Sequence, residues 1–120
     1  MIKTLKHKHN QESLMNLNYE KLIDTIKKDA KYSKIAAKRW SMFILQYKEI
    51  NPIFTDKLQK FKLTKTEFRL AIFTFSKLQN SEIAEILSIN IETVYIQRQR
   101  LAKKLGLKSV KEIESFLNNL

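Results

Sequence analysis

One glycine, Gly106, and one proline, Pro52, are the only residues of their kinds in this 120-residue chain. Tight hairpin turns depend on glycine, proline and asparagine, because few other residues adopt the backbone angles that these turns require. A chain with so little turn material cannot connect many short strands. The sequence therefore predicts an all-α fold, and its 43% hydrophobic content is enough to close a core.

Several functional classes are excluded by what the chain lacks. It has no cysteine, and its two histidines, His7 and His9, both lie in the N-terminal tail. No Ser/His/Asp order or glycine-rich phosphate loop is present, so we predict that the protein is not an enzyme and uses no metal or cofactor. No apolar stretch approaches the ~20 residues of a membrane span. We expect a cytoplasmic protein with no membrane partner.

The first half of the chain, residues 1–61, contains two amphipathic stretches. Apolar side chains recur at steps of three and four over residues 14–30 and again over 40–50, which is typical of helices with one buried face. The pattern leaves open whether residues 33–34 interrupt one helix or separate two. We interpret this half as a basic N-terminal tail followed by a helical extension.

A third helix is expected in this half, because Asn51 followed by Pro52 is typical of a helix start. This helix should run to about residue 61, and three apolar residues should turn inward: Ile53, Phe54 and Leu58. The aromatic stripe that includes Trp40 and Phe43 is too large to leave in water. We expect it to pack against helix 64–77.

The second half, residues 62–120, predicts four helices, over 64–77, 81–87, 91–105 and 109–120. Thr64 and Glu67 have the spacing of a capping box, Asn90 can cap the helix that follows it, and Gly106 stands where a left-handed C-terminal residue is needed. The second and third of these helices are joined by three residues, with Ala84 at the point of closest approach. This arrangement predicts a helix-turn-helix.

The outer face of helix 91–105 carries the chemistry. Stepping about 100° per residue from Val94, at the centre of the core face, the far side collects Glu92, Tyr95, Ile96, Gln99, Arg100 and Lys103. Between residues 91 and 111 there are six Lys and Arg and one acid. Such a face is either a solvated surface or a nucleic-acid interface, and its mixture of Gln, Arg and aromatic side chains favours the interface. Arg98 should be partly buried and paired with Glu82 or Glu85.

Four ordered pieces of sequence resemble a known family. Leu63-Thr64 with Glu67, then residues 80–87, 89–94 and 101–107, follow the LuxR type (GerE type) helix-turn-helix domain without a gap. The likeness covers residues 63–117. The segment from Trp40 to Leu58 is similar to the stretch that precedes this domain in the C-terminal output module of certain Bacteroidetes regulators.

The resemblance implies a four-helix domain that binds double-stranded DNA sequence-specifically as a transcription regulator, with helix 91–105 in the major groove. It implies base contacts from Tyr95, Ile96 and Gln99. It implies backbone contacts from Asn80, Ser81, Thr93, Arg100, Lys103 and Lys104. The alternative for Tyr95 and Ile96 is packing against a neighbouring helix.

The resemblance also bears on protein partners. Parts of the family use the last helix as a homodimer surface, and Val110, Ile113 and Leu117 could either form such a surface or close the core. An upstream sensor portion and RNA polymerase are further partners that the resemblance implies.

Two other functions compete with this hypothesis. A sigma-factor region-four-like module also uses a helix-turn-helix with a basic second helix. A helical protein-interaction adaptor is the other alternative, because residues 1–61 hold 13 Lys and Arg against six Asp and Glu and could bind an acidic protein.

Overall fold

The computed structural model describes residues 20–120, and this part of the chain is made of helices and connecting turns without a strand. A helix covers residues 20–32. It is followed by α2 (Ala37–Ile50), α3 (Pro52–Gln59), α4 (Lys65–Phe75), α5 (Asn80–Leu87), α6 (Ile91–Lys104), the 3₁₀ turn η1 (Val110–Glu112) and α7 (Ile113–Asn118). The predicted all-α class is confirmed. None of the described helices combines the length and apolar character needed to cross a bilayer.

The tail histidines, His7 and His9, lie outside the described residues, as does the beginning of the first amphipathic stretch. Residues 33–36 are not helical and separate the helix over 20–32 from α2. From residue 20 onward, the extension therefore has two separate helices before α3 and not one long helix.

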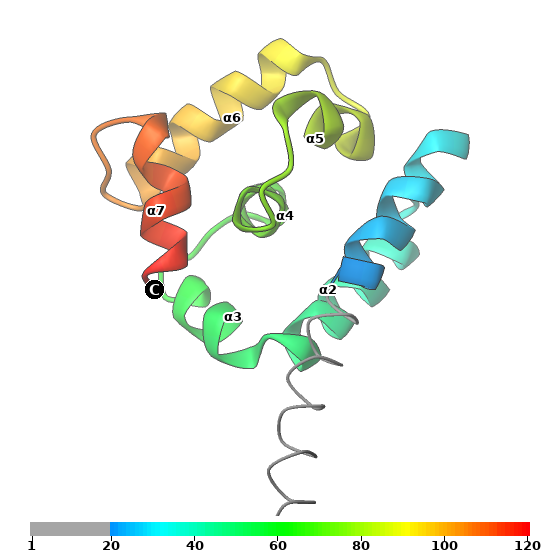
Figure 1. Ribbon diagram of the computed structural model, residues 1–120, viewed down its shortest axis with the longest axis horizontal. Helices are drawn as coiled ribbons and strands as arrows, with labels where there is room; N and C mark the ends of the chain where they lie inside the picture. Colours follow the sequence, from blue (N-terminus) through cyan, green and yellow to red (C-terminus); the bar gives the residue numbers. More distant parts are fainter. Residues whose placement is uncertain (1–19) are drawn as a thin grey trace, which may run out of the picture.

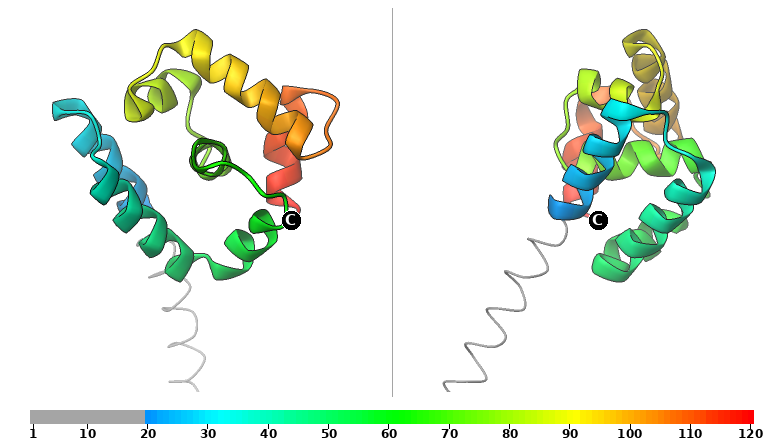
Figure 2. Two further views of the ribbon diagram at one scale, coloured as in Figure 1. Left: turned by 180° about the vertical axis from the view of Figure 1, so that it is seen from behind. Right: turned by 90° about the vertical axis from the view of Figure 1, so that its right-hand side faces the viewer.

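Helix α4 runs through the centre of the molecule, and the other helices surround it (Figure 1). Helices α5, α6 and α7 contact one another or α4 on one side, while α2 and α3 lie on the other. The same arrangement is visible from behind and from the side (Figure 2). The second half of the chain thus wraps around α4, and the extension covers the remaining face.

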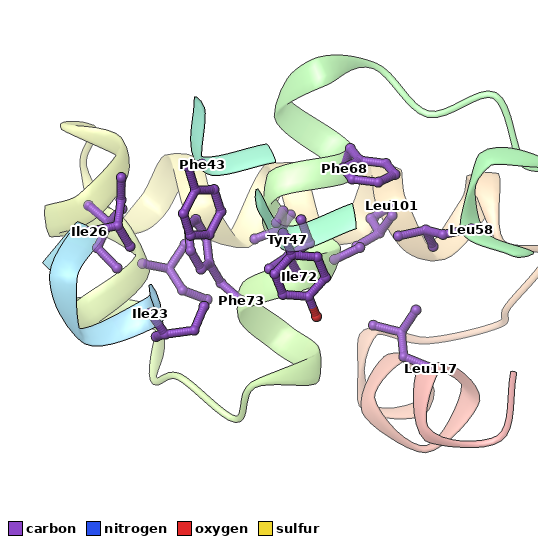
Figure 3. Packing of buried hydrophobic residues seen from close by; sticks show 14 of the residues in the cluster. Ile23, Ile26, Phe43, Tyr47, Leu58, Phe68, Ile72, Phe73, Leu101 and Leu117 are labelled. Carbon is purple, nitrogen blue, oxygen red and sulfur yellow. The ribbon is translucent and has the colours of Figure 1, made fainter. Parts of the chain in front are cut away.

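One hydrophobic core joins the two halves of the chain. Trp40 and Phe43 of α2 pack against Phe73 of α4, with ring centroids 6.0 and 5.8 Å away. Phe54 of α3 stacks on Phe75 at 4.2 Å. Figure 3 shows core side chains from the N-terminal helix, α2, α3, α4, α6 and α7 lying together. The expected packing of the aromatic stripe on helix 64–77 is confirmed.

Helix starts follow the sequence signals. The Thr64 hydroxyl accepts from the Glu67 amide at 3.1 Å, and the Glu67 carboxylate accepts from the Thr64 amide at 2.8 Å, which completes the predicted capping box. Pro52 begins α3 as expected, but this helix ends at Gln59. The expectation for Ile53 is wrong, because its side chain is 71% exposed while Phe54 and Leu58 are buried.

Three helix ends share a left-handed residue. Gly106 has φ +76° after α6, Ser88 has +56° after α5, and Lys77 has +64° after α4. In each case the amide of the following residue donates back across the last turn, as from Leu107 to the Ala102 carbonyl at 2.8 Å. The prediction for Gly106 is confirmed, and the other two positions achieve the same turn without glycine.

Candidate nucleic-acid interface

Helices α5 and α6 pack together across a three-residue turn. Ser88 ends α5 in the left-handed conformation, and the Ile89 amide donates to the Ala84 carbonyl at 3.0 Å. Ala84 is buried where the sequence predicted a close approach. Asn90 stands at the N-cap position of α6 with extended backbone, but its side chain makes no capping bond, so that detail of the prediction is wrong.

The inner face of α6 is apolar and buried. Val94 and Leu101 are fully covered, and Ala102 and the following Leu105 are nearly so. These residues recur at steps that place them on one side of a helix and press that side against α5 and α4. The orientation of α6 about its own axis is therefore determined by burial, and its opposite side must face outward.

The outer face of α6 is exposed to solvent. Tyr95 is 49% and Ile96 50% exposed, so about half of each side chain is available to a ligand. The charged and polar residues of the same face are also exposed: Glu92, Gln99, Arg100 and Lys103. Figure 1 shows α6 at the edge of the molecule opposite α3, with no described helix beyond it on the side away from α4.

Arg98 connects α6 to the start of α5. Its Nη1 donates to the Asn80 side-chain oxygen at 2.6 Å, and the guanidinium is half-buried. Burial lowers the pKa of Arg98, while the negative charge of Glu114 acts in the opposite direction. The predicted partial burial is confirmed, but the predicted carboxylate partner is wrong: an amide from the first turn of α5 takes that place.

Glu82, one of the two expected partners of Arg98, binds elsewhere. Its carboxylate lies 2.7 Å from the Lys27 ammonium of the N-terminal helix and accepts from the Gln79 amide at 2.9 Å. The Lys27 hydrogen bond, followed by the Gln79 amide, lowers the pKa of Glu82. The same contact raises the pKa of Lys27. This ion pair joins the N-terminal helix to α5.

Lys104, the last residue of α6, is turned toward α4. Its ammonium donates to the Glu67 carboxylate and to the Lys62 carbonyl, each at 3.2 Å. Burial alone would raise the pKa of Glu67, but hydrogen bonds from the Thr64 amide, Lys104 and the Thr64 hydroxyl lower it overall. Lys104 therefore has a structural role at the far end of α6, and any contact with a ligand would have to compete with Glu67.

The residues predicted as a dimer surface are largely inside the chain. Ile113 is fully buried and Leu117 is 1% exposed, while Val110 is half-buried. Helix α7 packs against α4 with Ile113 and Leu117 as its buried residues, and Val110 lies in η1, which contacts α6 and α7. The dimer interpretation is wrong for Ile113 and Leu117, which close the core instead.

The structure brings the predicted contact residues to one region with one exception. Tyr95, Ile96, Gln99, Arg100 and Lys103 share the outer face of α6, and the partly exposed Thr93 lies in its first turn. The exposed Ser81 and partly exposed Asn80 lie in the first turn of α5, where Asn80 contacts Arg98 of α6. Lys104 is the exception. Lys27 and Asn80 have positioning roles that sequence reasoning missed, because their partners are far away along the chain. Within residues 20–120, no group of three or more His, Asp or Glu side chains could hold a metal ion.

Comparisons of the chain with protein-family models, with curated proteins and with solved structures found no match.

Proposed function

We propose that this protein binds double-stranded DNA and acts as a transcription regulator of the LuxR helix-turn-helix type. In this proposal α6 enters the major groove, which is wide enough to admit a helix, and α5 crosses the backbone at the groove's edge. The observation that carries the proposal is the outer face of α6, where exposed cationic, amide and aromatic side chains lie on a helix fixed by its buried side.

The roles of the side chains follow from their chemistry. Gln99 offers both a donor and an acceptor to base edges, and Tyr95 and Ile96 offer apolar contact to a thymine methyl group. Arg100 and Lys103 would neutralise phosphates and release counterions. The Asn80 oxygen accepts from Arg98, so its amide nitrogen and the Ser81 hydroxyl are side-chain groups of α5 that can donate to phosphate.

The proposal is tested by fluorescence anisotropy of labelled duplexes, titrated with the whole chain at salt concentrations from about 50 to 200 mM. We expect binding that weakens steeply with salt, with the logarithmic slope reduced by about one in Lys103→Ala. Lys57→Ala is the matched control, because Lys57 is an exposed lysine on α3, across the molecule from α6. Binding that ignores salt, or that Lys57→Ala weakens as much as Lys103→Ala, contradicts the proposal.

Base readout needs a separate measurement. Sites selected from random duplexes by the parent chain should differ from those selected by Gln99→Ala or Tyr95→Ala. Each substitution should reduce the binding free energy by about 1 to 3 kcal/mol at particular base pairs. Arg100→Ala should weaken binding to all sites alike. Identical selected sites for all of these variants would contradict α6 as the reading element.

A further inference from the structure

A groove beside α2 includes none of the side chains that the DNA-binding proposal uses. It lies between α2 and the start of α4, has a volume of about 500 Å³, and is open to solvent. Its floor is apolar, formed by Trp40, Ile44, Leu63 and Phe68. A second hollow of about 470 Å³ adjoins it and shares Ala37, Trp40 and Arg69 with it. Ile86 and Leu87 of α5 complete the wall of the second hollow. We call the two neighbouring hollows together the α2–α4 groove.

The charged residues along the α2–α4 groove are all cationic. Lys48, Lys65 and Arg69 line the larger hollow and Lys34 lines the smaller one, and no described residue that lines either hollow is acidic. Glu67 is close in sequence, but its carboxylate is engaged by Thr64 and Lys104. An anionic occupant would therefore meet four cations without a competing carboxylate.

Arg69 lies where the two hollows meet. Its guanidinium stacks on the Trp40 ring at 4.2 Å from the centroid, and its Nε makes no hydrogen bond to a described residue. Burial lowers the pKa of Arg69, with no carboxylate nearby to oppose the effect. A partly desolvated guanidinium is stabilised when a carboxylate binds it.

Exposed apolar side chains continue the groove on α2. Leu45, which lines it, is 62% exposed, and Met42 on the same helix is 49% exposed. An apolar floor with a basic rim matches an amphipathic helix, whose leucine-type anchors fill the floor while its polar face meets the rim.

We propose that the α2–α4 groove binds an acidic amphipathic helix of a partner protein. The helix lays its apolar face over Trp40 and Leu45 and directs carboxylates to Arg69, Lys48 and Lys65. This site is separate from the outer face of α6, so the chain can bind DNA and this partner at the same time.

The test is selection from a displayed library of helical peptides with leucines at steps of three and four residues and random charges elsewhere, using the whole chain as bait. We expect the enriched peptides to be acidic and to change the fluorescence of Trp40, the only tryptophan of the chain. Lys48→Glu should weaken their binding at least about tenfold. Lys57→Glu, which alters net charge equally outside the groove, should weaken it far less.

Two further variants separate this inference from the DNA proposal. Leu45→Ser should weaken peptide binding and leave duplex binding unchanged, whereas Lys103→Glu should do the reverse. Enrichment of neutral or basic peptides, or no enrichment, overturns the inference. It is also overturned if Lys48→Glu reduces duplex binding as strongly as Lys103→Glu, or if the chain self-associates in sedimentation and Leu45→Ser abolishes that association.

Discussion

The Arg98 guanidinium donates a 2.6 Å hydrogen bond to the side-chain oxygen of Asn80, across the packed pair of α6 and α5. Arg98 is half-buried on the flank of α6, between its apolar inner side and its exposed outer side. The bond links the middle of α6 to the first turn of α5. If α6 reads DNA, this contact adds to the burial of Val94 and Leu101 in holding its outer face toward solvent.

Breaking this bond should cost stability in an asymmetric way. Asn80→Ala leaves the half-buried guanidinium without its acceptor and should lower the free energy of unfolding by about 1 to 3 kcal/mol. Arg98→Met removes the charge and keeps the volume, and should cost less than Asn80→Ala. Urea unfolding followed by Trp40 fluorescence measures both. In the Arg98→Met background, Asn80→Ala should lower the free energy of unfolding little further. If the losses of the two single variants simply add in the double variant, the two side chains do not stabilise the fold through their shared bond.

The Lys27 and Glu82 pair should make stability depend on pH at both extremes. The folded-state pKa of Glu82 is lowered, so its contribution is present above the ordinary value of 4.5 and is lost as pH falls through the lowered value. The pKa of Lys27 is raised, so its contribution is present below 10.5 and is lost as pH rises through the raised value. Both side chains are about one-third exposed, which limits the effect to about 0.5 kcal/mol at low salt.

The measurement compares urea midpoints between about pH 3 and about pH 7, a range that includes the ordinary pKa values of carboxylate side chains. Glu82→Gln should reduce the loss of stability that the parent chain shows as the pH falls. Added salt should make the urea midpoints of the variant and the parent chain more alike. Glu92→Gln removes the same charge from an exposed position in α6 and is the matched control. An equal reduction in both variants would show that the ion pair is not responsible.

Substitutions at two of the left-handed helix ends should change the stability of the fold in opposite directions. Lys77 is exposed at φ +64°, a conformation that is costly for a residue with a Cβ atom, so Lys77→Gly should stabilise the fold by about 1 kcal/mol. Gly106 adopts φ +76°, and a Cβ added there would meet no atom within 4 Å. Gly106→Ala should therefore destabilise by about 1 kcal/mol through backbone strain alone. Thermal unfolding by circular dichroism tests both, and shifts of the same sign would contradict the argument.

Local sequence signals anticipated the local structure. The Thr64 capping box, the Gly106 helix end and the three-residue turn before α6 each depend on residues within a few positions of one another. Contacts between distant elements were not predictable in the same way. The partner of Arg98, the pairing of Lys27 with Glu82 and the orientation of Lys104 all depend on how complete helices pack.

The inward side of a short helix was ambiguous for a related reason. Ile53 and Phe54 are neighbours about 100° apart around α3, so both cannot lie at the centre of one buried face. The sequence pattern of eight residues does not decide between them. Packing against α4 does, because Phe54 stacks on Phe75 and leaves Ile53 exposed.

The shared core makes a last prediction, that residues 20–61 and residues 62–120 unfold together. Phe43 is fully buried in α2 and contacts Phe73 of α4, so Phe43→Ala should cost about 3 to 5 kcal/mol. A loss of that size is a large part of the 5 to 15 kcal/mol typical of a whole domain. Trp40 fluorescence reports on α2, and circular dichroism reports on all helices. The two signals should therefore give one midpoint in the parent chain and one lower midpoint in Phe43→Ala, because α2 has no core of its own.

Leu45→Ala, at an exposed position of the same helix, is the control and should move neither midpoint appreciably. Separate midpoints in the parent chain, with fluorescence changing first, would mean that residues 62–120 fold without the extension.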